Sequence, residues 1–241
     1  MDLADRMACA DVIQAWGFAR DQGRWAALLD TFHTGGQIHV SWFQGSFPDF
    51  VERCRQNYGK GSTAKHLLWP ARVQVNGDRA TAETNVAIMV RQVIEGIESD
   101  LISNSRFLDR LEKRDGTWRM VERACVYEQD RLDPVEPSPK FDKLMQSADA
   151  AKYPAAYRYM GYRVGAAGRA LAEPVHYDGR AETEALGALG DGGEGIDRDE
   201  HGLGEVLGRG VDVAARQLVL VGEGDGMDEE VERTPLPGDR L

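Results

Sequence analysis

The apolar residues of the chain recur in two rhythms, a helical one at the start and an alternating one in the middle. Over residues 5–22 they return at the spacing of one helix face, and a break at residues 23–25 leads into a second short helix. A turn over residues 33–36 precedes residues 37–42, whose alternation predicts a half-buried strand. A third helix is expected over residues 48–58.

Long alternating stretches follow the third helix. Residues 65–75 predict a strand, and the sequence Asn76-Gly77-Asp78 behind it is a strong hairpin signal. Turns then separate three long antiparallel strands, expected over residues 81–94, 101–113 and 118–128. This order indicates an α+β fold, in which a curved sheet wraps around the N-terminal helices and leaves a cone-shaped internal cavity for a small ligand.

Prolines at positions 134, 137 and 139 end the sheet region. Beyond them, residues 150–168 predict a helical segment that carries three tyrosines on or near one side. We expect this arm to pack on the sheet or on a neighbouring subunit. The chain is therefore divided into an α+β domain (residues 1–133), a C-terminal helical arm (residues 134–188) and a tail (residues 189–241).

The tail differs in composition from the rest of the chain. It holds 14 acidic and 5 basic side chains and 12 of the 27 glycines, whereas all 19 aromatic residues lie at or before Tyr177. A segment of this kind buries too little apolar surface to offset the ordering of its backbone. We expect residues 189–241 to be disordered and seek the function before them.

Charge and cysteine content exclude several classes of partner. The 241 residues carry a net charge of −11, which disfavours nucleic acid. No apolar stretch reaches the roughly 20 residues of a membrane span, and the N-terminus lacks the basic start of a signal peptide, so a cytoplasmic protein is expected. The three cysteines form no C-x-x-C pair. We expect neither a metal site nor a coenzyme.

Five histidines are candidates for chemistry. His33 lies in a predicted turn and is interpreted as a solvated or capping residue. His39 alternates with apolar neighbours and is expected to face away from the core. His176 and His201 lie in or beside the tail and are interpreted as surface residues. His66 is different, because it begins a mostly apolar strand.

Two interpretations of His66 and of Asp21 remain open from the residues alone. An imidazole at the start of an apolar strand is either a hydrogen-bonded core residue or a base. Asp21 ends the first predicted helix, where the helix dipole does not favour a carboxylate. Either another group holds it there, or it is an exposed residue that pairs with Arg20 or Arg24.

Three motifs in this order resemble a known family. They are Asp21 three residues before Arg24-Trp25, the approach to His66 over residues 63–66 with its strand end at Val75-Asn76-Gly77-Asp78, and the segment 106–119. Together they resemble the SnoaL-like group of the nuclear transport factor 2-like superfamily over about residues 5–130. Its members include scytalone dehydratase, hexachlorocyclohexane dehydrochlorinase, ketosteroid isomerases, polyketide cyclases and non-enzymatic scaffolds.

The resemblance implies a conical α+β barrel and a catalytic pair. In the dehydratase and the dehydrochlorinase an aspartate on the first helix pairs with a histidine on the strand after the third helix, and Asp21 and His66 match these positions. Asp21 would orient the imidazole, and His66 would take a proton. The residue before the aspartate, a tyrosine in scytalone dehydratase, is Arg20 here.

Further side chains are candidates for substrate binding. Asn104, Arg106 and Trp69 are candidate donors toward developing negative charge. The expected apolar lining consists of Trp16, Trp42, Phe43, Trp69 and Trp118.

Two functions of different class follow. The first is a lyase or isomerase that needs no cofactor and acts on a small cyclic or aromatic molecule. The alternative is a non-catalytic ligand-binding or dimerisation module. A homo-oligomer is expected in either case, because Val86, Ile88 and Val90 are predicted to form an apolar outer face of the sheet.

Overall fold

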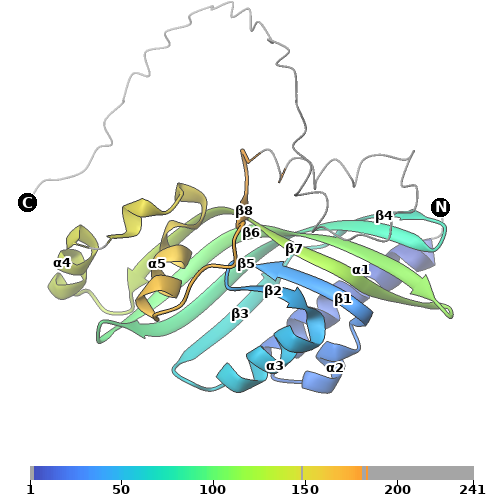
Figure 1. Cartoon of the computed structure of the whole chain (residues 1–241), viewed down its shortest axis with the longest axis horizontal. Helices are drawn as coiled ribbons and strands as arrows, with labels where there is room; N and C mark the ends of the chain where they lie inside the picture. Colours follow the sequence, from blue (N-terminus) through green and yellow to red (C-terminus); the bar gives the residue numbers. More distant parts are fainter. Residues whose placement is uncertain (1–2, 148, 181–182, 184–241) are drawn as a thin grey trace, which may run out of the picture. The chain divides into compact units, whose positions relative to one another are not determined.

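The computed structural model describes residues 3–147, 149–180 and 183, and their elements follow an α+β order (Figure 1). The helices are α1 (Leu3–Asp21), α2 (Trp25–Leu29), α3 (Phe47–Asn57), α4 (Pro139–Ser147) and α5 (Arg158–Ala166), with 3-10 turns η1 (Asp149–Lys152) and η2 (Ala155–Tyr157). The strands are β1 (Phe32–Val40), β2 (Phe43–Ser46), β3 (Ser62–Leu68), β4 (Arg72–Asn76), β5 (Arg79–Ile94), β6 (Ile97–Arg114), β7 (Thr117–Pro134) and β8 (His176–Tyr177).

The strands form one curved, unclosed sheet. Its order is β2-β1-β7-β6-β5-β3, with β4 also paired to β5 and β8 also paired to β7. Neighbours are antiparallel except for β1 and β8, which run parallel to β7. Figure 1 shows α1, α2 and α3 together on one side of this sheet. The predicted α+β class, with a mostly antiparallel sheet and N-terminal helices, is confirmed.

Two tight turns set the register of the three long strands. Glu95 and Gly96 connect β5 to β6, and Asp115 and Gly116 connect β6 to β7. All four residues have positive φ, between 49° and 78°. Positive φ at both central residues is the conformation that fits a two-residue hairpin to the twist of its strands. The predicted meander therefore has the turn residues that it needs.

Helix α1 carries a glycine where it contacts β3. A Cβ atom on Gly17 would overlap with the Cδ1 atom of Leu68. Asp21 lies one turn further along the same face of α1, and His66 lies two residues before Leu68 on the same face of β3. The close contact therefore brings Asp21 and His66 next to each other.

The C-terminal arm packs on the sheet of its own chain. The Asp130 carboxylate on β7 accepts a hydrogen bond of 2.7 Å from the backbone N–H of Met160 in α5. The ring of Tyr157 lies 6.1 Å from Tyr127 on β7 and 5.6 Å from Tyr177 on β8. Of the two placements considered for the arm, the structure thus has it on the sheet.

Several predicted boundaries are wrong. The strand expected over residues 65–75 is broken at residues 69–71, where Pro70 has no N–H for the ladder. Residues 33–36 belong to β1, which shifts register against β7 between Phe32 and Gln37, so the glycine pair marks a bulge instead of a turn. Helix α4 was not expected, and residues 150–168 form η1, η2 and α5 instead of one helix.

The argument for an apolar outer face is also wrong. Val86, Ile88 and Val90 are 1%, 8% and 4% exposed and belong to the hydrophobic core. The alternate positions of β5 that reach solvent include polar residues such as Asn85 and Arg91. The homo-oligomer remains a prediction, but these three residues no longer support it.

The tail expected over residues 189–241 lies outside the described residues. None of the helices in the described part of the chain is long and apolar enough to cross a membrane.

Candidate active site

Asp21 and His66 lie in direct contact. The Oδ1 atom of Asp21 is 2.6 Å from Nδ1 of the His66 ring, and its Oδ2 atom accepts a 2.8 Å hydrogen bond from the His66 backbone N–H. The side chains are 4% and 9% exposed. The ammonium group of Lys65, which is half exposed, lies 3.6 Å from Oδ2. The carboxylate is thus fixed at both oxygens, and the imidazole at one nitrogen.

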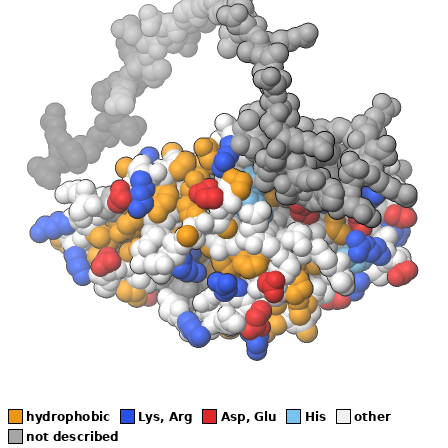
Figure 2. Space-filling view, viewed as in Figure 1, with side chains coloured by type: hydrophobic (Ala, Val, Ile, Leu, Met, Phe, Trp, Pro, Cys, Tyr) orange, Lys and Arg blue, Asp and Glu red, His pale blue; other side chains and the backbone are white. Residues whose placement is uncertain are grey.

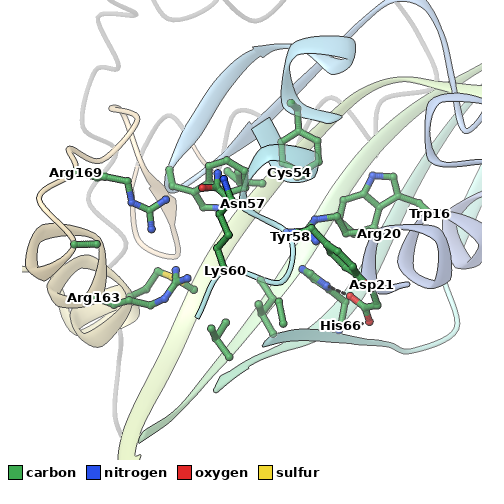
Figure 3. A pocket seen from close by; sticks show the side chains of 18 of the residues that line it. Trp16, Arg20, Asp21, Cys54, Asn57, Tyr58, Lys60, His66, Arg163 and Arg169 are labelled. Carbon is green, nitrogen blue, oxygen red and sulfur yellow. Dashed lines mark hydrogen bonds and ion pairs between the residues drawn. The ribbon is translucent and has the colours of Figure 1, made fainter. Parts of the chain in front are cut away.

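Neighbouring elements hold this pair in place. Asp21 is the last residue of α1, and Gly23, with a φ of 66°, turns the chain toward α2. The Trp16 ring meets the His66 ring edge to face, with centroids 5.4 Å apart. Packing against Trp16 and bonding to Asp21 together leave the imidazole little rotational freedom. The second ring nitrogen, Nε2, is directed toward the cavity (Figure 3).

The electrostatic environment favours a neutral imidazole beside a charged carboxylate. Burial lowers the pKa of His66 below its ordinary 6.5, and the nearby charges of Arg20 and Arg123 lower it further, against the opposing effect of Asp21. Burial raises the pKa of Asp21, but the hydrogen bonds from His66 and the charges around it outweigh burial, so that the pKa is lowered. A neutral imidazole at neutral pH is the form that can accept a proton.

The pair lines a cavity of about 560 Å³ (Figure 3). Its walls come from α1, α3, the sheet and the C-terminal arm. One part of the wall is apolar or aromatic, and it is formed by Trp16, Val40, Trp42, Phe50, Ile88, Val90, Phe107 and Met160. The other part is polar or charged, and it includes Arg20, Asn57, Tyr58, Lys60, Arg163 and Arg169. A cavity of this size fits a small ring compound.

The predicted aromatic lining is placed there only in part. Trp16 and Trp42 line the cavity. Phe43 lies behind it, 5.7 Å from the ring of Phe50. Trp118 is buried elsewhere and donates its Nε1–H to Asp5 at 2.7 Å. Trp69 follows the end of β3 and is 50% exposed, so it neither encloses the cavity nor donates into it.

Asn104 and Arg106 lie on the other face of β6. Odd-numbered residues of this strand, such as Phe107, face the interior, and even-numbered residues alternate with them. Arg106 binds three carboxylates there, Glu83 at 3.0 Å and Glu128 and Asp178 at 2.6 Å each. The interpretation of both residues as donors in the cavity is therefore wrong in placement.

The sequence prediction missed most of the polar lining. Arg20 stands directly before Asp21, where scytalone dehydratase has a tyrosine, but it was not predicted to line the cavity. Tyr58 and Lys60 follow α3. Arg163 and Arg169 come from the C-terminal arm, whose position over the cavity is set by tertiary packing. No local pattern in the sequence indicates that they belong to the site.

A buried ion pair lies beneath the aromatic wall. Arg123 donates to Asp109 through Nε at 2.6 Å and through Nη2 at 2.7 Å, and both side chains are fully buried. The guanidinium also lies 4.4 Å from the Trp16 ring and 4.2 Å from the Phe107 ring. This pair supports two residues that line the cavity.

Two other reactive groups of the lining are inactive or engaged in hydrogen bonds. Burial raises the pKa of the Cys54 thiol to about 11, so it does not supply a thiolate nucleophile. The Tyr127 hydroxyl donates to Ser41 Oγ at 2.9 Å and accepts from the Ser41 backbone N–H at 3.0 Å. Among the described residues no cluster of three His, Cys, Asp or Glu side chains could hold a metal ion.

Three other histidines lie outside the cavity, and their surroundings differ from those expected. His33 is a buried strand residue whose Nε2 lies 2.9 Å from the carbonyl oxygen of Glu112, so it is not solvated. His39 faces away from Ile38 as expected, but the arm covers it. His176, expected on the surface, is 1% exposed, and its Nε2 lies 3.0 Å from Nδ1 of His39.

The fold and the site define an α+β protein with an aspartate–histidine pair in an interior cavity. The model of one family, described as the SnoaL-like domain, matches residues 1–124, which is just over half of the chain. The protein therefore belongs to the SnoaL-like domain family, as the motifs around Asp21 and His66 indicated.

Two curated proteins are similar over two thirds of the chain. The Pea pathogenicity protein 2 of Fusarium vanettenii is 28% identical over 163 residues, which cover 66% of this chain and 68% of that protein. An uncharacterized protein of Emericella nidulans is 26% identical over 170 residues, which cover 66% of this chain and 70% of that protein.

Solved structures with a similar fold include two whose names refer to a dehydratase and a dehydrochlorinase. A putative scytalone dehydratase from Novosphingobium aromaticivorans is 16% identical, with a TM-score of 0.47, over 56% of this chain and 96% of that one. A hexachlorocyclohexane dehydrochlorinase from Novosphingobium barchaimii is 17% identical, with a TM-score of 0.48, over 56% of this chain and 93% of that one.

Proposed function

We propose that the protein is a lyase or isomerase of the general-base type, which uses Asp21 and His66 on a small cyclic or aromatic substrate and needs no cofactor. The observation that carries this proposal is the 2.6 Å contact between Asp21 Oδ1 and His66 Nδ1 at the wall of a cavity. A base must reach the proton that it removes, and the ring nitrogen of His66 that does not contact Asp21 is our candidate for this base.

The chemistry follows from which nitrogen carries the proton. Because Asp21 accepts at Nδ1, the neutral ring keeps its proton there and leaves the lone pair on Nε2 for the substrate. When Nε2 takes a proton, the Asp21 carboxylate stabilises the imidazolium that forms. A positioned base contributes about 10²- to 10⁴-fold to the rate. The remainder must come from placement and from stabilising the negative charge left on the substrate.

Two features of the cavity fit this role. The aromatic and aliphatic wall can hold a ring against His66 and exclude water, which strengthens electrostatic interactions inside. The Arg20 side chain lines the same cavity and comes from the helix residue next to Asp21. Its positive charge is suited to an enolate or an alkoxide that develops when the proton leaves.

One observation favours a non-catalytic alternative. Asp21 also accepts a hydrogen bond from the His66 backbone N–H, so the pair ties α1 to β3 in any case. In a ligand-binding module the same two residues would serve stability alone. Replacing them would then lower stability without changing any rate.

Proton exchange tests the proposal without knowledge of the substrate. The wild-type protein is incubated in deuterated buffer with cyclic carbon acids such as indanone and beta-tetralone, and exchange at the acidic C–H is followed by NMR. We expect exchange above the buffer rate, which Asp21→Asn and His66→Gln both reduce to a similar level, because the two residues act as a unit. The matched control is His33→Gln, which removes a buried imidazole that does not line the cavity.

Two outcomes contradict the proposal. Exchange at the wild-type rate in a folded His66→Gln variant would place the base elsewhere. Loss of stability in both variants, with no panel compound exchanged by the wild-type protein, would favour the binding module.

A further inference from the structure

The charges that line the cavity are strongly unbalanced. Four cationic side chains reach it from different parts of the fold: Arg20 from α1, Lys60 from the segment after α3, Arg163 from α5 and Arg169 from the segment behind α5. Among the described residues of the lining, Asp21 is the one carboxylate, and His66 occupies both of its oxygens. Residues 1–188 carry 24 basic and 26 acidic side chains and are close to neutral as a whole, so the excess of positive charge is local to the cavity.

Arg163 carries most of this argument because its partners are neutral. Its Nε donates to Gln92 Oε1 at 2.6 Å, and its Nη1 lies 3.8 Å from the sulfur of Met160. No carboxylate of the described residues lies within ion-pair distance of it. Burial lowers the pKa of Arg163 to about 10, and the charges of Arg169 and Arg20 act in the same direction. A partly buried guanidinium held among like charges is costly unless an anion compensates it.

Arg20 adds a second charge of the same kind. It also has no carboxylate partner within ion-pair distance among the described residues, and its charge lowers the pKa values of both His66 and Arg163. The three groups therefore interact across one cavity. Lys60 and Arg169 are exposed. Water can solvate their charges, so these two side chains have less need of an anionic ligand.

The cavity has a cationic end and a reacting end. Figure 3 shows Arg163 and Arg169 on one side, the Asp21–His66 pair and Arg20 on the other, and Lys60 and Tyr58 between them. The apolar wall includes Ile88, Val90 and Phe107. A ligand with an anionic group and an apolar ring would match this distribution, with its charge at Arg163 and its ring toward His66.

Figure 2 shows that the outer surface of the described part, in contrast, carries blue and red side chains interspersed on the face in view. The cavity lining, with four cationic side chains and one carboxylate, is less balanced in charge than this face.

We propose that the cavity binds a small organic acid whose anionic group pairs with Arg163, with Arg20 and Arg169 adding to the attraction. This inference names a substrate class for the proposed active site. It rests on the proposed function only in placing the ring of the ligand at His66. The planar guanidinium matches a carboxylate or a phosphate through paired hydrogen bonds. The probes below include one carboxylate and one phosphate, so the experiment distinguishes the two anionic groups.

Binding of matched acids and amides tests the proposal on the full chain. Dissociation constants of phenylacetate, phenylacetamide and benzyl phosphate are measured by NMR titration at neutral pH and at two salt concentrations. We expect phenylacetate or benzyl phosphate to bind at least about tenfold more tightly than the amide, since hydrogen bonds between a guanidinium and an anion are stronger than those to a neutral amide. The tighter of the two anions identifies the source.

Variants assign the effect to the arginine. Arg163→Met should remove the preference for the acid over the amide, and Arg163→Lys should restore part of it. The matched control is Arg131→Met, whose side chain is 76% exposed and pairs with Asp133 away from the cavity. If Arg163→Met does not fold, Arg20→Gln is measured in its place and should reduce the same preference.

Two results would overturn the proposal: an amide that binds as tightly as the acid, or an acid preference that survives Arg163→Met and Arg20→Gln. The outcome separates from that of the proposed function. His66→Gln should keep the acid preference, because it removes the base and leaves the arginines in place. Acid binding without any proton exchange would contradict the base alone, and proton exchange without acid preference would contradict the anion site alone.

Discussion

Replacing Asp109 with asparagine should destabilise the protein strongly, although the new side chain has nearly the same shape. Asp109 on β6 stands directly opposite Arg123 on β7. Their two hydrogen bonds are 2.6 and 2.7 Å long, and both side chains are fully buried. The neutral amide would leave the Arg123 charge without a counter-charge and out of water. Removing one partner of a buried pair costs about 3–5 kcal/mol.

Thermal and urea unfolding near neutral pH measure this loss. In a chain of this size 1 kcal/mol shifts the melting temperature by about 2–4 °C, so we expect a decrease of about 6–20 °C. The double variant Asp109→Leu with Arg123→Met removes both charges and should lose less than the single variant. A single variant within about 1 kcal/mol of wild type, below the usual cost of breaking a buried pair, would refute the reasoning. So would a double variant less stable than the single one.

Three further predictions concern the helix contact, the histidines and the tail. Gly17→Val should push α1 away from Leu68, lower the free energy of unfolding in urea by about 1–3 kcal/mol and reduce proton exchange. Gly17→Ala needs only the end of Leu68 to move and should change both quantities less. Equal effects of the two variants would contradict this contact. Burial lowers the pKa values of His39 and His66, so the folded state binds fewer protons than the unfolded state. The stability that these two histidines contribute is therefore complete above pH 6.5 and should decline as the pH falls through their folded pKa values. Unchanged melting between neutral and mildly acidic pH would contradict this sign. From composition, a chain that ends at Gly187 should keep the melting temperature of the full chain, and a clear decrease would place the domain boundary further along.

Local signals in the sequence indicate the fold, whereas the pairing of Asp21 with His66 came from the resemblance to the SnoaL-like group. Asn76-Gly77 and the later turn residues position the hairpins, and the spacing of apolar residues indicates α1 and α3. Asp21 at the end of a helix and His66 in an apolar strand are each in an unfavourable place by themselves. Their positions become reasonable only as partners, which the resemblance to the SnoaL-like group suggested.

The rest of the site depends on information that local patterns lack. Whether Arg106 points into the cavity depends on which face of β6 is buried. The buried face carries the odd-numbered residues, such as Phe107, so Arg106 lies on the opposite face. The prediction of an unbroken strand over residues 65–75 did not include the break at Pro70, beside which Trp69 is exposed. Arg163 and Arg169 lie far along the chain in an arm whose docking on β7 depends on long-range packing. A charge on such an arm has no sequence signature of a binding site.

The protonation state of His66 tests the central claim most directly. The chemical shifts of its ring nitrogens are followed by NMR across the pH range in the wild-type protein and in Asp21→Asn. We expect a neutral ring at neutral pH with its proton on Nδ1, a pKa below the ordinary 6.5, and a shift of the proton to Nε2 in the variant, where the amide N–H₂ group can donate to Nδ1. A wild-type ring that carries its proton on Nε2, or that is charged at neutral pH, would leave no lone pair facing the cavity and would contradict the general base.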